Sequence, residues 1–146
     1  MKRQDTLIRL RKFRVDELQR RMASINAMQT DVEKKITDLE ESVTREKQRA
    51  ADSDIGRLAF PSFLRAIDIR RANLNNTLQE IDRERAACQD ELTDAYQDLK
   101  SLQFAYEQQE KRMAEAENRR AQGRLDEMAL VRHLRKHPAR SNRDQV

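Results

Sequence analysis

The fold is decided by residues 15–43, VDELQRRMASINAMQTDVEKKITDLEESV, in which apolar residues recur at alternating steps of three and four. The same spacing extends over residues 8–50, and the residues between these positions are mostly charged or polar. Such a repeat marks the a and d positions of a coiled coil and predicts a left-handed supercoil with a partner helix. The positions of this first seam are Ile8, Arg11, Val15, Leu18, Met22, Ile25, Gln29, Val32, Ile36, Leu39, Val43, Glu46 and Ala50.

A second seam with the same spacing follows later and predicts a second long helix. Between the seams lie Gly56, which favours a turn with positive φ, and Pro61, which is favoured at the first position of a helix. We therefore expect an all-α fold, a long antiparallel two-helix coiled-coil hairpin; the alternative is two continuous helices that each pair with another chain. The positions of the second seam are Ile67, Arg71, Leu74, Leu78, Ile81, Arg85, Cys88, Leu92, Ala95, Leu99, Leu102, Tyr106, Gln109, Met113, Ala116 and Arg120.

The expected hairpin is a single domain over residues 1–137, with a helix at about 5–51, a loop at about 52–60, a helix at about 61–137 and a disordered tail at 138–146. If residue 50 lies beside residue 62, then residue 5 lies beside residue 107. Residues 108–137 then have no internal partner and form an extension about 45 Å long if helical. Residues 1–14 carry six basic side chains and one acidic side chain, and residues 119–146 carry eight and three. Both basic termini therefore meet at one end of the hairpin, which suggests different partners at its two ends.

The composition excludes most other folds. The chain has 146 residues, of which 38% are charged and 4% aromatic, with two Gly and two Pro. So few turn residues exclude an all-β fold, and the mean hydropathy of −1.02 fits either a disordered chain or long helices. A single cysteine excludes an internal disulfide and indicates a reducing compartment. With no signal-peptide pattern and no apolar run that approaches the roughly 20 residues of a spanning helix, we expect a soluble, cytoplasmic protein.

No catalytic or metal constellation stands out in the sequence. A two-helix rod offers no pocket in which tuned groups converge, so we expect no enzymatic activity and no cofactor. His133 and His137 have a metal-pair spacing, but no acidic third ligand follows on that face, and solvated histidines near a helix end are the simpler interpretation. Cys88 falls on the second seam and is interpreted as a small core residue.

Polar seam residues and the aromatic loop end allow two interpretations each. A polar residue in a seam fixes register, and Gln29 is expected to share a layer with Arg85. At the basic end, Arg11, Gln109 and Arg120 either do the same or face a partner. The apolar cluster at the loop end either closes the coiled coil or forms a docking tip. This cluster consists of Phe60, Phe63, Leu64 and Ile67.

Two segments resemble the FliJ family, the small coiled-coil component of bacterial flagellar protein export. They are residues 5–17, DTLIRLRKFRVDE, and residues 60–67, FPSFLRAI. The length, the basic termini and the single hairpin are similar as well, and the likeness covers about residues 1–135. The resemblance implies a non-enzymatic stalk and regulator of the flagellar type III export ATPase, which promotes ring assembly and activity, contacts the membrane export gate and assists export chaperones. It places the chain in flagellar biogenesis, protein transport, chemotaxis and motility, at the cytoplasmic face of the membrane.

The resemblance also implies two binding surfaces. The expected partners are the hexameric ATPase, the export-gate protein and export chaperones; no nucleic acid is expected, and the protein is peripheral to the membrane rather than inserted. The gate surface, at the loop end, comprises Phe60, Phe63, Leu64, Ile67 and Arg70. The ATPase surface, at the basic end, comprises Arg9, Arg11, Lys12, Phe13, Gln109, Met113 and Arg120.

Two functions from other classes compete with this interpretation. A homodimeric structural coiled coil would tether or space other proteins, and a stable parallel dimer would support it. A basic coil would bind nucleic acid or an anionic membrane, with retention that collapses as salt is added.

Overall fold

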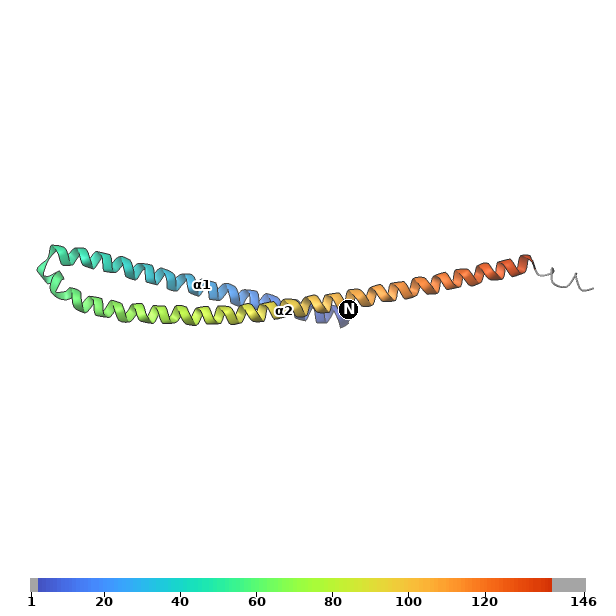
Figure 1. The fold of residues 1–146 in the computed structure, drawn as a ribbon, viewed down its shortest axis with the longest axis horizontal. Coiled ribbons are helices and arrows are strands. Elements are labelled where there is room, and N and C mark those ends of the chain that lie inside the picture. The colour runs from blue at the N-terminus through green and yellow to red at the C-terminus, as the bar shows by residue number, and fades with distance from the viewer. Residues whose placement is uncertain (1–2, 138–146) are drawn as a thin grey trace, which may run out of the picture. The chain divides into compact units, whose positions relative to one another are not determined.

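The protein consists of two long α-helices, α1 (Arg3–Asp52) and α2 (Asp54–Lys136). A computed structural model describes residues 3–137, and this part of the chain contains no strand. The chain divides into two compact units, Met1–Leu99 and Lys100–Val146. In the first unit, α1 and the first part of α2 run side by side in opposite directions and are joined at one end by the turn (Figure 1). The predicted all-α hairpin is confirmed.

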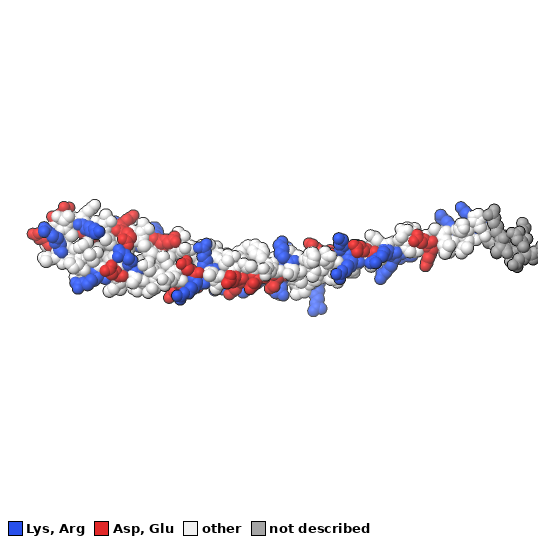
Figure 2. Space-filling model, viewed as in Figure 1, with Lys and Arg blue, Asp and Glu red and all other residues white. Residues whose placement is uncertain are grey.

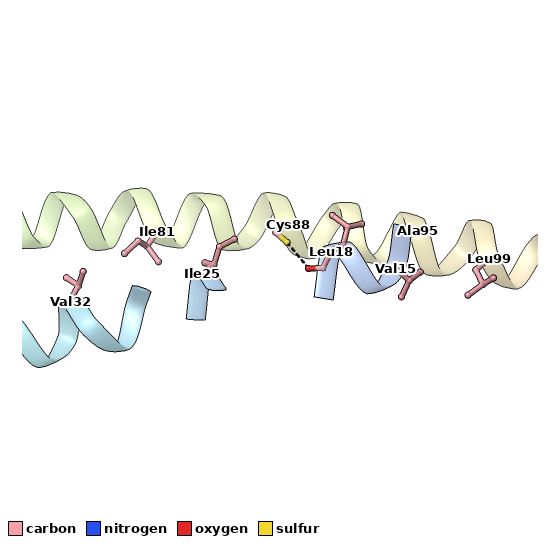
Figure 3. Packing of buried hydrophobic residues seen from close by; sticks show 8 residues of the cluster. All are labelled: Val15, Leu18, Ile25, Val32, Ile81, Cys88, Ala95 and Leu99. Atoms are coloured by element: carbon pink, nitrogen blue, oxygen red, sulfur yellow. Dashed lines mark hydrogen bonds between the residues drawn. The ribbon is translucent and has the colours of Figure 1, made fainter. Parts of the chain in front are cut away.

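The core of the first unit lies along the two predicted seams. Every buried hydrophobic residue occupies a position of one seam or the other. Leu18 and Cys88 are the largest fully buried side chains, and they face each other across the interface (Figure 3). Full burial of a leucine side chain stabilises a fold by about 1.5–3 kcal/mol. The larger of two clusters contains Val15, Leu18, Ile25 and Val32 of α1 with Ile81, Cys88, Ala95 and Leu99 of α2.

Polar contacts across the interface fix the register of the two helices. The Arg85 guanidinium donates a hydrogen bond to Gln29 Oε1 at 3.1 Å, so the predicted polar layer is confirmed. Nearer the turn, Arg71 donates two hydrogen bonds to the Glu40 carboxylate, at 2.8 and 3.2 Å. These bonds to Glu40 raise the pKa of Arg71 above its ordinary value, which keeps its guanidinium charged. Figure 2 shows acidic and basic side chains interspersed over the visible face of the hairpin.

The turn is much shorter than the expected loop at 52–60. Between the ends of α1 and α2 stands a single residue, Ser53. Its Oγ accepts a hydrogen bond from the Gly56 N–H at 2.9 Å, which is the contact of a helix N-cap. The expectation that the second helix begins near Pro61 was wrong, because Ser53 starts the helix earlier and Pro61 lies inside it.

The expectation that Gly56 provides a turn with positive φ was also wrong. No glycine among the described residues has a positive φ. Instead, a Cβ at Gly56 would lie 2.7 Å from the carbonyl oxygen of Arg49, closer than a real Cβ approaches. The first turn of α2 therefore passes so close to the last turn of α1 that only a residue without a side chain fits. The turn requires the absence of a Cβ rather than an unusual backbone conformation.

The second unit carries the last part of α2, which continues without interruption to Lys136. From Met113 onward its large apolar side chains are exposed, with Leu125 at 59% and Leu134 at 60%. A Cβ at Gly123 would meet nothing within 4 Å. No helix within residues 3–137 is long and apolar enough to cross a membrane. The disordered tail expected at 138–146 lies outside the described residues.

Candidate partner-binding surfaces

The predicted gate surface lies at the turn end of the hairpin and is partly built into its core. Ile67 is 6% exposed and packs with Leu39 and Val43 in the smaller of the two buried clusters. Phe63 and Leu64 are half-buried against this cluster. The interpretation of these residues as the closure of the coiled coil therefore has direct support. A partner reaches the Ile67 side chain only if the hairpin opens locally.

Two residues of this surface remain open to a partner. Phe60 is half-buried, and its ring stacks on that of Phe63 with centres 6.5 Å apart and planes at 23°. Arg70 is exposed on the same helix. Aromatic rings and guanidinium groups are both enriched in binding hot spots, so each of these two side chains is a candidate contact.

Two further apolar residues at the turn were missed from the sequence. Ile55 is 81% exposed and Leu58 is 82% exposed, higher values than those of the other exposed large hydrophobic residues. They lie one turn apart on α2, and Ile55 lines a shallow groove of about 360 Å³ together with Ser53 and Gly56. Because the segment was expected to be a loop, its helical spacing was not considered. Recognising Ser53 as an N-cap would have placed both residues on one helical face.

The predicted ATPase surface draws on both units. In the first unit, Arg9, Arg11 and Lys12 are exposed at the start of α1, and Phe13 is 63% exposed. Arg11 also lines a groove of about 240 Å³ together with the carboxylates of Glu91, Asp94 and Asp98, so its charge faces acidic neighbours within the hairpin.

In the second unit, Gln109, Met113 and Arg120 are exposed on α2. Met113 is 65% exposed, and the Arg120 guanidinium lies 4.0 Å from the carboxylate of Glu117. These residues and the start of α1 belong to different units, and each group is a separate exposed surface. The site residues predicted from the sequence end at Arg120, although the unpaired extension expected over residues 108–137 includes the more pronounced surface that follows.

That surface, the C-terminal helix surface, covers residues 124–135 of α2. It contains a groove of about 480 Å³ lined by Met128 and Val131 and bordered by three arginines and Glu127. Apolar side chains at a helix surface, surrounded by guanidinium groups, suit a partner that offers both apolar contact and carboxylates. The arginines are Arg124, Arg132 and Arg135.

These observations define the class of the protein as an all-α coiled-coil hairpin whose helices present exposed apolar and charged surfaces. Within residues 3–137, no three His, Cys, Asp or Glu side chains come together to hold a metal ion. The sequence model of a protein family described as "Flagellar FliJ protein" matches residues 1–138, and the chain belongs to that family.

Two relatives agree with this assignment. Both are named "Flagellar FliJ protein" and come from Caulobacter vibrioides, strains NA1000 / CB15N and ATCC 19089 / CIP 103742 / CB 15. Each is 24% identical over 127 residues, which cover 87% of this chain and 91% of the relative. No solved structure matches the chain significantly. Family membership makes this chain a flagellar export-related protein, as the resemblance predicted.

Proposed function

We propose that this chain is a non-enzymatic stalk and regulator of the flagellar type III export ATPase, promoting assembly of the ATPase ring and its activity. The observation that carries this proposal is the C-terminal helix surface, because a polar, water-exposed helix with apolar and cationic side chains fits an apolar and acidic binding site on a partner. The paired part of the chain supplies stiffness, since a continuous seam buries side chains along the whole hairpin.

The contact with the ATPase is proposed at the basic end. The cations there are spread along the helices and exposed, so they offer many modest contacts rather than one deep anchor. Distributed contacts suit a shaft that must engage equivalent subunits of a ring. The proposed residues are Arg9, Arg11, Lys12, Phe13, Gln109, Met113 and Arg120, together with the C-terminal helix surface.

The contact with the membrane export gate is proposed at the turn end, through the exposed parts of Phe60 and Arg70. Phe63, Leu64 and Ile67 support this surface from within the hairpin. Assistance to export chaperones, and a position at the cytoplasmic face of the membrane export apparatus, complete the proposal.

The ATPase contact is tested by measuring binding to the export ATPase of the same organism. The variant Met128→Ser, Val131→Ser removes the two apolar side chains that line the groove of the C-terminal helix surface, without removing an arginine. We expect its affinity to fall by about tenfold or more, since truncating buried anchors costs more than 1 kcal/mol each. Asn118→Ser, at an exposed position of the same helix, is the matched control and should bind normally. If the unaltered chain, the double variant and the control bound the ATPase with equal affinity, the ATPase contact would lie elsewhere on the chain.

The gate contact is tested with Phe60→Ala and Arg70→Ala, which change side chains that remain accessible. Both should weaken gate binding or flagellar export while helicity stays near that of the unaltered chain. Ile67→Ala is a poorer test, because removing a buried side chain costs about 2–5 kcal/mol of stability by itself. Normal export with both exposed variants would identify this cluster as packing alone.

A homodimeric tether remains the competing function, and the exposed apolar residues of α2 are the feature that favours it. Sedimentation separates the two functions. A monomer at micromolar concentration supports the stalk, whereas a stable dimer that ignores the ATPase supports the tether.

A further inference from the structure

Two histidines lie one helical turn apart at the end of α2, and the first of them falls within the C-terminal helix surface. His133 and His137 are the only histidines in the chain. The N–H of His137 donates to the carbonyl of His133 at 3.2 Å, so the helical spacing continues through His137. Both residues are exposed. Their imidazoles therefore share one face of the helix and are accessible to an ion from solution.

The separation of the two rings fits a shared metal ion. Their centres are 5.1 Å apart, with planes at 61°. An imidazole nitrogen about 2.0–2.1 Å from Zn²⁺ places its ring centre about 3.2 Å from the metal, and at a tetrahedral angle two such ring centres lie about 5 Å apart. We propose that His133 and His137 chelate one divalent transition-metal ion of the zinc, nickel and copper class.

The surroundings make the site selective for ions that prefer nitrogen. Arg132, Arg135 and Lys136 oppose the approach of any dication, whereas the negative end of the helix dipole attracts one. No carboxylate joins the two imidazoles within residues 3–137 to form a group of three ligands. Binding therefore depends on the imidazole lone pairs. Ions that prefer oxygen, such as Mg²⁺ and Ca²⁺, do not bind here, and water completes the coordination of the ion that does.

Metal binding at this site stabilises the last turns of α2. Two imidazoles four residues apart are held at chelating distance by the helix and not by the unfolded chain, so the ion binds the helical form preferentially. The end of the helix thus gains order whenever a suitable metal is present.

The test uses the full chain, free of any affinity tag, titrated with Zn²⁺ and followed by calorimetry and by NMR of the imidazoles. One ion should bind per chain and shift both imidazole signals. His133→Ala and His137→Ala should each weaken binding by about a hundredfold, because one ligand loses the effective-concentration advantage of two. Mg²⁺ should produce no response.

A spacing control keeps the number of histidines constant. The double variant Arg135→His, His137→Ala places two histidines two positions apart, on different faces of the helix, and also removes a repelling cation. It should bind Zn²⁺ no better than a single-histidine variant. The proposal would be overturned if this control or either single variant bound Zn²⁺ as tightly as the unaltered chain does. It would also be overturned if the unaltered chain showed no saturable Zn²⁺ binding.

Discussion

Replacing Gly56 with alanine tests the close approach of the two helices at the turn. The added Cβ would lie 2.7 Å from the carbonyl oxygen of Arg49 and 3.0 Å from its carbonyl carbon. Because both atoms belong to the backbone, relief requires that one helix moves. Forced overpacking costs about 1–3 kcal/mol, whereas alanine in a helix gains about 1 kcal/mol over glycine. The expected net effect is a loss of stability of up to about 2 kcal/mol.

Gly123→Ala is the matched control on the same helix. Nothing lies within 4 Å of a Cβ at this position, so only the propensity term applies. The substitution should raise helix stability by about 1 kcal/mol. Urea unfolding followed by circular dichroism at the helix band measures both variants, and the two changes should have opposite signs.

The close approach at Gly56 would be contradicted if Gly56→Ala stabilised the protein as much as Gly123→Ala does. A Cβ would then be accommodated at the turn. The first turn of α2 would then lie farther from α1 than described, and the one-residue turn would be wrong.

Three further tests examine the hairpin by substitution, with urea unfolding as the main measurement. Leu18→Ala should cost about 2–5 kcal/mol because Leu18 is 1% exposed, and Leu10→Ala, at 63% exposure, should cost less than about 0.5 kcal/mol; similar losses would mean that the core lies elsewhere. Ser53→Ala removes the cap of α2 and should cost about 1 kcal/mol, whereas Ser53→Asp should restore it; an unchanged midpoint in Ser53→Ala would contradict the cap. The double variant Gln29→Leu, Arg85→Leu should be more stable but less uniform in register and oligomeric state by sedimentation, and a single stable monomer would refute the register role.

The sequence predicted the helices and their buried faces well, because period alone determines which side chains of a helix meet a partner. All buried hydrophobic residues fall on the two seams, and Gln29 pairs with Arg85 as the spacing required. An uninterrupted repeat outweighs the low apolar content of the chain, because a two-helix coiled coil buries mainly the a and d positions of each heptad.

The turn was not predictable in the same way. Glycine and proline suggested a loop of several residues, but the chain reverses around Ser53 alone. The deciding feature is the approach of Gly56 to the backbone of Arg49, which is a tertiary contact that no local pattern contains. The same error hid the exposure of Ile55 and Leu58, because a residue read as loop has no assigned face.

The candidate site was only partly accessible from the sequence. Composition located the basic end and the aromatic cluster, but it did not separate the accessible Arg70 from the buried Ile67, since both lie in one short segment of helix. Exposure separates them, and exposure depends on the packing of α1. The partner of each surface is determined by the shape and charge of both interacting surfaces, and the sequence of this chain contains only one of them.

The proposed stalk function is tested by measuring ATP hydrolysis by the export ATPase of the same organism as this chain is titrated into it, with ring assembly followed in parallel. We predict that stimulation and ring formation saturate near one chain per hexamer, and that removal of residues 119–146 reduces both while the hairpin stays folded. If the chain neither binds nor stimulates the ATPase and forms a stable dimer, it is not a stalk of that ATPase.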